Sequence, residues 1–153
     1  MYGFGQKSNE QLATCSPELI AVARSVILLV DHSILQGART TAEQTANVAA
    51  GVSQTMNSKH LSTPARAFDF APHHPKFGVI VGTPSQMKDI AQKTNKRLGE
   101  IESWVREQYT YIAGMYIAAG NAMGHKLISG CDWNRNGDLF DNRFDDMGHI
   151  ELA

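Results

Sequence analysis

The sequence predicts an α+β fold, in which a small antiparallel sheet carries helices packed on it. Two observations lead to this expectation. Helical patterns occupy residues 16–30, 40–52 and 84–123, and the strand patterns between and after them are short and isolated. A chain of 153 residues can bury one core but is short for two, so we expect a single domain over residues 1–153.

The first half of the chain contains two predicted helices and one strand. Residues 16–30 (SPELIAVARSVILLV) open on a Ser-Pro pair typical of a helix start, and apolar residues follow at helical spacing. Residues 32–37 (HSILQG) form a short strand pattern that ends on glycine. Residues 40–52 (TTAEQTANVAAGV) open on threonines that can cap a helix and close near a glycine that can end it.

The middle of the chain reads as a strand followed by helices. Residues 66–72 (RAFDFAP) alternate, with both phenylalanines on one face and Asp69 on the other, and the final proline is expected to end the strand. A connection punctuated by Pro and Gly follows over 73–83. The helical pattern of 84–123 is expected to split into two pieces near Gly99.

The last part of the chain contains two more strand patterns separated by a polar loop. The strands are KLISGCDW (126–133) and GHIEL (148–152), and the loop is GDLFDNRF (137–144). Strands of this length around longer helices are typical of the predicted antiparallel sheet.

Composition excludes several classes of function. The net charge is −1 and no Lys/Arg run occurs, which argues against nucleic acid as a partner. No apolar run is long enough to span a bilayer and no secretory signal pattern opens the chain, so we expect no stable membrane insertion. Cys15 and Cys131 lie far apart, and we expect both to be reduced, buried thiols.

The C-terminal strand pattern raises the question of a metal site. His149 and Glu151 alternate with aliphatic residues, so one face of that strand presents an imidazole and a carboxylate. No HExxH motif occurs, so a site must draw on other strands, where His60 and Asp69 are available. Two imidazoles and one carboxylate leave a fourth position open, as catalytic zinc sites do. Each residue also has an ordinary interpretation as a loop or surface group, and spacing alone leaves both interpretations open.

Several stretches carry a resemblance to a known family. SKHLSTPARAFDF resembles the SxHxxGxAxD signature of the zinc D-alanyl-D-alanine peptidase superfamily, and DDMGHIEL resembles its closing metal-ligand strand. The chain is more closely similar to the single-domain L-alanyl-D-glutamate endopeptidases that tailed phages use as endolysins, through FGQKSNEQLATCSPEL, ILQGARTTAEQ and ISGCDWNRNGD. The likeness is weakest over 73–100, which we interpret as a family-variable insertion.

The resemblance implies a set of site residues. His60, Asp69 and His149 would be zinc ligands on the sheet, and Asp146, three positions before the last ligand, would be the general base. The neighbouring Asp145 is expected to point elsewhere. The signature places its His and Asp seven apart, whereas here they are nine apart, which we interpret as a turn lengthened by two residues.

Other residues acquire supporting roles through the same resemblance. Arg39 matches the family's GxR segment and would contact substrate or a developing oxyanion, and Ser58 would be a supporting hydrogen-bond partner. We expect Glu151 to orient an imidazole. His73 and His74 are competing ligands, which we interpret as loop residues carried away from the strand face by the proline that follows.

A second constellation lies in CDWNRNGDLFDNR. Asp132, Asn134, Asn136 and Asp138 alternate as the first ligands of a calcium loop do, and Asp141 is a further candidate ligand. An arginine stands at the twelfth position instead of a bidentate glutamate. An Asx-rich turn without an ion is the alternative, and the sequence leaves both open.

Together these observations predict an endolysin: a zinc peptidase that hydrolyses the L-Ala–D-Glu bond of peptidoglycan stem peptides, with calcium as a second possible cofactor. A D-Ala-D-Ala carboxypeptidase or dipeptidase on the same scaffold, and an inactive wall-binding module, are the alternatives. We expect a monomer that stays in the host cytoplasm until the membrane is permeabilised and then acts on periplasmic peptidoglycan.

Overall fold

A computed structural model describes residues 1–139, 141 and 146–153 of the chain. The α-helices in this part are α1 (Gln6–Leu12), α2 (Pro17–Val26), α3 (Thr41–Ala49), α4 (Pro84–Thr94) and α5 (Leu98–Ala122), with a 3-10 helix η1 (Lys59–Leu61). The strands are β1 (His32–Gln36), β2 (Ala67–His74), β3 (Gly78–Val79), β4 (Leu127–Ser129) and β5 (His149–Leu152). The predicted α+β class is confirmed.

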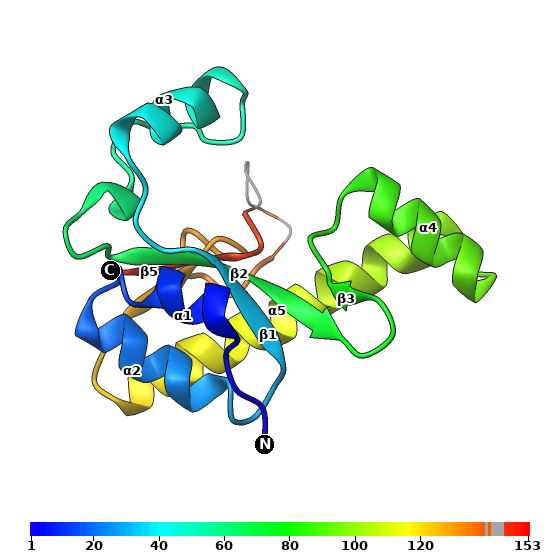
Figure 1. Cartoon of the computed structure of the whole chain (residues 1–153), viewed down its shortest axis with the longest axis horizontal. Helices are drawn as coiled ribbons and strands as arrows, with labels where there is room; N and C mark the ends of the chain where they lie inside the picture. The colour runs from blue at the N-terminus through cyan, green and yellow to red at the C-terminus, as the bar shows by residue number, and fades with distance from the viewer. Residues whose placement is uncertain (140, 142–145) are drawn as a thin grey trace.

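The strands form one antiparallel sheet in the order β1-β2-β5-β4, and β3 pairs with the far end of β2 (Figure 1). The long strand β2 therefore lies inside the sheet, between β1 and the C-terminal strand β5. Because side chains alternate across a strand, each strand presents one face to the core and the other to the opposite side. Phe68 and Phe70 point into the core, and Asp69 between them points away from it.

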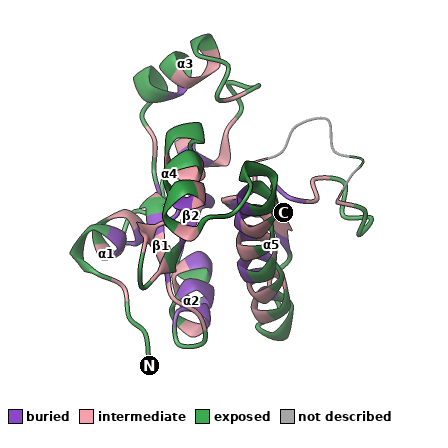
Figure 2. Ribbon diagram, turned by 90° about the vertical axis from the view of Figure 1, so that its right-hand side faces the viewer, coloured by how far each residue is buried: buried purple, intermediate pink, exposed green. Residues whose placement is uncertain are grey.

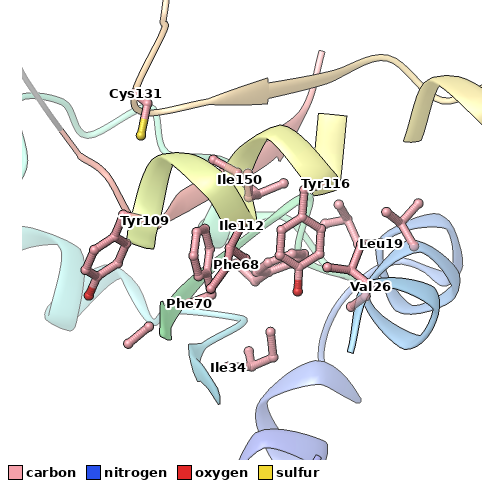
Figure 3. Packing of buried hydrophobic residues seen from close by; sticks show 14 of the residues in the cluster. Leu19, Val26, Ile34, Phe68, Phe70, Tyr109, Ile112, Tyr116, Cys131 and Ile150 are labelled. Carbon is pink, nitrogen blue, oxygen red and sulfur yellow. The ribbon is translucent and has the colours of Figure 1, made fainter. Parts of the chain in front are cut away.

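The core lies between the sheet and the helices α2 and α5 (Figure 3). Tyr116 of α5 packs edge-on against Phe68 at 5.1 Å between ring centroids, and Tyr109 packs on Phe70 at 5.6 Å. Ile150 of β5 completes this layer and is fully buried. Large aromatic groups in such arrangements contribute strongly to the stability of a small core. The sheet is therefore stabilised by the aromatic layer packed against it.

Helix α3 lies apart from this core, as Figure 1 shows, and Figure 2 shows it mostly exposed. Its start is defined locally, because Thr40 and Glu43 form a reciprocal capping box. Gly51, with φ 71°, follows its C-terminal end, as the sequence predicts. The single buried residue of α3 is Gln44.

Some element predictions are wrong or incomplete. β2 continues through Pro72 to His74, because β1 and β3 pair with its last residues. The interruption between α4 and α5 lies at 95–97, where Asn95 adopts φ 55°, and Gly99 lies inside the first turn of α5. Neither α1 nor β3 was predicted, since α1 is short and β3 has two residues.

Among the described residues, no helix combines the length and the apolar character needed to cross a membrane. Cys15 and Cys131 are buried, and neither is part of a disulfide.

Candidate metal and catalytic site

The strand register brings three polar residues side by side on the face of the sheet opposite the core. Asp69 of β2 pairs directly with His149 of β5, and on its other side it pairs with Gln36 of β1. Directly opposed residues of antiparallel strands project from the same face. A register shift between Ile34 and Gln36 is needed for the pairing of Gln36 with Asp69.

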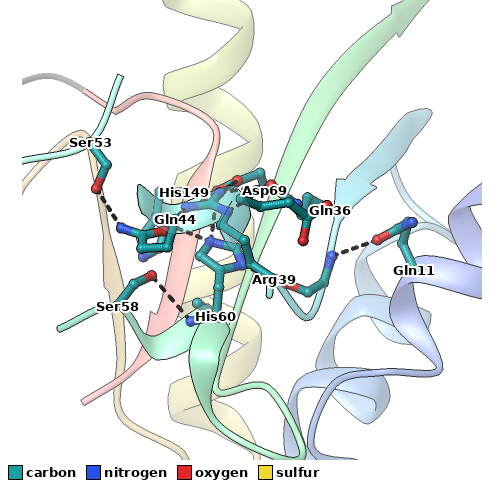
Figure 4. A network of polar contacts seen from close by, with 12 residues as sticks. Gln11, Gln36, Arg39, Gln44, Ser53, Ser58, His60, Asp69 and His149 are labelled. Carbon is teal, nitrogen blue, oxygen red and sulfur yellow. Dashed lines mark hydrogen bonds and ion pairs between the residues drawn. The ribbon is translucent and has the colours of Figure 1, made fainter. Parts of the chain in front are cut away.

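His60 completes the group from outside the sheet. It lies in η1, whose start is capped by the Ser58 hydroxyl accepting a hydrogen bond from the His60 backbone amide at 3.3 Å. His60 Nε2 lies 3.3 Å from Asp69 Oδ1 and 3.3 Å from His149 Nδ1, and His149 Nδ1 lies 3.1 Å from Asp69 Oδ1 (Figure 4). These residues form a group able to hold a metal ion.

The far nitrogen of each imidazole is held by an acceptor. His60 Nδ1 donates to the carbonyl oxygen of Gly37 at 2.5 Å, and His149 Nε2 donates to Glu151 Oε2 at 3.1 Å. In the neutral form of each ring, the nitrogen facing Asp69 is then a lone-pair acceptor. A cation placed between these three acceptor atoms would satisfy them together.

The electrostatics of this group favour positive charge. Burial alone would lower the pKa of His149, but its hydrogen bonds to Asp69 and Glu151 outweigh burial and raise the pKa to about 9. Burial would raise the pKa of Asp69, but its hydrogen bonds to His149 and His60 hold that pKa well below the usual range. The surroundings that hold a proton on His149 would equally hold a divalent cation.

Gly37 allows the carbonyl contact to His60 because the chain passes very close to α1. A Cβ atom on residue 37 would lie 2.2 Å from the carbonyl oxygen of Gln11. Only glycine fits there without moving the backbone. Its amide also donates to Gln11 Oε1 at 3.0 Å, so the position of the Gly37 carbonyl is fixed by α1.

Asp146 lines the same cleft as His60, Asp69 and His149. Its backbone is tied on both sides, because its amide donates to the Gly130 carbonyl at 3.2 Å and its carbonyl accepts from the His149 amide at 2.9 Å. A Cβ on Gly130 would lie 2.0 Å from the Asp146 carbonyl oxygen, so this approach requires glycine. Burial, and then the negative charge of Asp69, raise the pKa of the Asp146 carboxyl. A carboxylate with a raised pKa is a better proton acceptor.

Arg39 is engaged with the site's own residues. Its Nη2 donates to Asp69 Oδ2 at 3.1 Å, its Nη1 to Gln44 Oε1 at 2.6 Å, and its Nε to Gln36 Oε1 at 3.0 Å. Asp69 thus faces the imidazoles with one oxygen and Arg39 with the other. In the structure Arg39 holds Asp69, and its predicted contact with substrate stays a prediction.

The cleft above the ligands has a volume of about 420 Å³. His60, Asp69 and His149 line it together with residues 52–55 and 57, and we call the segment 52–57 the wall segment. Trp133 lines the cleft too, and its ring lies against that of His149 with centroids 5.1 Å apart. The cleft is therefore open to a peptide-sized group and reaches Asp146 and the ligands at once.

The other predicted site residues have separate outcomes. Ser58 and Glu151 support His60 and His149 as expected. His73 and His74 are not loop residues as predicted: they end β2, where His73 pairs with Asp31 at 2.9 Å and His74 stacks on the Phe77 ring. Neither belongs to the metal-binding group. Asp145 lies outside the described residues.

The predicted calcium loop is closed by its own polar groups. Asp132 accepts from the amides of Asn136 and Gly137 at 3.2 and 3.0 Å, and Asp141 accepts from the side chains of Asn134 and Asn136 at 3.0 and 2.6 Å. Asp138 donates its amide to the Asn136 side-chain oxygen at 2.7 Å. These contacts fit the turn interpretation, and the structure adds no support for calcium, which stays a prediction.

Calorimetry tests that prediction. We expect weak to moderate calcium binding, because the loop offers carboxylates but lacks the bidentate glutamate at the twelfth position. The double variant Asp132→Ala, Asp138→Ala should lose the binding and keep the transition metal at His60, Asp69 and His149. An absence of heat together with an unchanged melting temperature in calcium would leave the loop as a turn.

Two site residues, Gln36 and Gln44, were not found from the sequence. Gln36 ends a strand pattern and Gln44 lies in a mostly polar helix, and neither position carries a motif in a single sequence. Their roles follow from contacts with Arg39 that only the folded chain brings together.

Replacing Glu151 by Gln should weaken metal binding. The imidazole of His149 would keep an acceptor but lose a negative charge that raises its basicity, and loss of such outer partners typically costs about 10–100-fold in metal affinity. Competition with a chromogenic chelator measures this change. Glu102→Gln, an exposed residue of α5, is the matched control and should bind metal as the parent does.

Comparisons with known proteins agree with this geometry. Residues 1–100 match the model of the phage L-alanyl-D-glutamate peptidase family, a range that includes all of 73–100. The chain is 33% identical over 160 residues to the L-alanyl-D-glutamate peptidase of Escherichia phage T5, covering 99% of this chain and 98% of that protein. The crystal structure of the Serratia marcescens L-Ala D-Glu endopeptidase ChiX matches with a TM-score of 0.67 and 25% identity, covering 99% of this chain and 91% of the other.

Proposed function

Because this chain belongs to the phage L-alanyl-D-glutamate peptidase family and is a peptidoglycan hydrolase of the endolysin type, we propose that it is a zinc enzyme cutting the L-Ala–D-Glu bond of the stem peptide. The observation that carries the proposal is the convergence of His60, Asp69 and His149 at the floor of a cleft that Asp146 also lines.

Zinc suits the donor set. Two neutral imidazoles and one carboxylate are a frequent ligand set of catalytic zinc, and both imidazoles here are oriented by acceptors behind them. When bound, zinc would supply Lewis-acid activation of the attacking water and of the scissile carbonyl.

The chain's own residues would move the proton. The Asp146 carboxylate would take a proton from the water that attacks the L-Ala carbonyl and deliver it to the departing amine of D-Glu. Its raised pKa, caused by burial and by Asp69, suits both halves of this transfer. Arg39 would keep Asp69 in place while charge develops, since it holds the outer oxygen of that carboxylate.

Mass spectrometry of the fragments released from purified peptidoglycan tests the proposal. Cleavage of the L-Ala–D-Glu bond should release peptides that begin with D-Glu and leave L-Ala on the glycan. Release of free D-Ala instead would identify a D-Ala-D-Ala carboxypeptidase. Binding to peptidoglycan without any released fragment would identify a wall-binding module and refute the enzyme.

We further propose that the protein acts as a monomer, and that it waits in the host cytoplasm until the membrane is permeabilised and then reaches periplasmic peptidoglycan. The near-neutral charge and the size of the cleft support a peptide partner within the wall over nucleic acid. Fractionation of infected cells before and after permeabilisation tests the location.

A further inference from the structure

Gln44 occupies an unusual position in helix α3. Every other residue of α3 is exposed or only partly buried, whereas Gln44 is 0% exposed. A polar side chain that is fully buried must place its donors and its acceptor on partners, because an unsatisfied group would cost stability. Gln44 does so in two opposite directions.

Its acceptor faces the metal-binding group. Gln44 Oε1 accepts from Arg39 Nη1 at 2.6 Å, and Arg39 in turn holds Asp69 Oδ2 at 3.1 Å (Figure 4). A charged donor makes this the stronger kind of hydrogen bond. The amide oxygen of Gln44 is therefore two contacts away from a metal ligand.

Its donors face the wall segment. Gln44 Nε2 donates to the Ser53 hydroxyl at 2.9 Å and to the Thr55 backbone carbonyl at 2.5 Å. The Ser53 hydroxyl contacts the same carbonyl at 3.3 Å. The wall segment contains no helix or strand, and Val52, Gln54 and Thr55 are exposed, so a buried core does not hold it in place.

We propose that Gln44 is a positioning residue that sets the substrate-binding wall of the cleft at a fixed place relative to the metal ligand Asp69. One planar amide joins the two, with its oxygen on the Arg39–Asp69 side and its nitrogen on the wall side. A substrate that touches both the wall and the metal-binding group is bound in a productive position only if their spacing is fixed. This role rests on the proposed function, because it concerns how the stem peptide is held.

Gln44→Glu separates the two halves of the contact. One carboxylate oxygen can still accept from Arg39, but the other would face the Thr55 carbonyl oxygen and cannot donate to it. We expect backbone amides of the wall segment to exchange hydrogen with solvent at least about tenfold faster. With a soluble stem peptide, KM should rise about tenfold while kcat and metal content stay close to the parent's.

Gln44→Leu is the second variant, because it removes both halves. It should show the same faster exchange and, in addition, a lower affinity for the metal, since Arg39 loses an acceptor that helps it to hold Asp69. Thr45→Ala, on an exposed neighbouring position of α3, is the matched control and should behave as the parent in every measurement.

Two results would overturn the proposal. The first is parental exchange of the wall segment in Gln44→Glu. The second is faster exchange with KM unchanged, or with the loss confined to kcat. Hydrogen exchange needs no activity, so a parent that cleaves no peptide would refute the proposed function while the structural role of Gln44 is still decided.

Discussion

Asp146→Asn should lower the turnover number by about 10² to 10⁴ while the protein keeps its fold and its metal. Asparagine has nearly the same shape, but it cannot accept a proton at neutral pH. The loss corresponds to about 2.7 to 5.4 kcal/mol in the activation barrier. The backbone contacts of residue 146 with Gly130 and His149 do not involve the side chain and should persist. Release of stem peptides from purified peptidoglycan measures the rate, and elemental analysis measures the metal.

Asp89→Asn is the matched control for this prediction. Asp89 is an exposed residue of α4 that pairs with Lys93 at 2.6 Å, so its replacement changes the charge equally, outside the cleft. It should cleave at the parental rate. If Asp146→Asn also cleaves at that rate, Asp146 is not the base. If the Asp146→Asn variant is slow but has lost its metal, the role of Asp146 is in binding the metal.

His149→Ala should weaken metal binding enough for the metal to be lost to a chelator, and peptide release should be lost with it. The substitution removes one of the three proposed ligands and leaves Asp69 without a partner that now lies 3.1 Å away. If each ligand contributes roughly a quarter of the binding free energy typical of zinc sites, the affinity falls on the order of 10² to 10³-fold. Elemental analysis after dialysis against a weak chelator checks the loss. Stoichiometric zinc in this variant would remove His149 from the site.

His73→Ala is the control that the sequence itself provides. His73 was a competing ligand, and the structure places it at the end of β2 in contact with Asp31. Its replacement should leave metal content and peptide release unchanged. A loss of metal in His73→Ala would contradict the ligand set.

The places of Asp69 and His149 on the sheet could be predicted because their determinants are local, and their role as metal ligands stays a prediction. Alternation in two strands decides that Asp69 and His149 point away from the aliphatic face, and pairing of those strands then places them side by side. Residues 62–66 connect η1 to β2, and the two-residue lengthening between His60 and Asp69 stays a prediction. The resemblance to a family added the role of Asp146, which no periodicity indicates.

The contacts that hold His60 and Asp69 in place could not be predicted from the sequence, because they are long-range and involve the backbone. Gly37 contacts His60 through its backbone carbonyl group. Every residue has this group, so the residue type at position 37 does not reveal the contact. Gln36 meets Asp69 only because β1 shifts its register there. Helix α1 is short and has few apolar residues, so its pattern is weak, although it fixes the place of Gly37.

Because helix α3 is separate from the hydrophobic core, we expect the molecule to show two thermal stabilities. The core cluster includes residues of the sheet and of the other α-helices, but none from α3, which is held near the cleft by the polar contacts of one side chain. Regions with little buried apolar surface open at lower free energy than the core. On heating, peptide release should therefore decline several degrees before the circular dichroism of the sheet and long helix changes, and it should return on cooling. The temperature range in which such an enzyme works would then be limited by its least-packed helix, and substitutions that stabilise the core alone would not widen it.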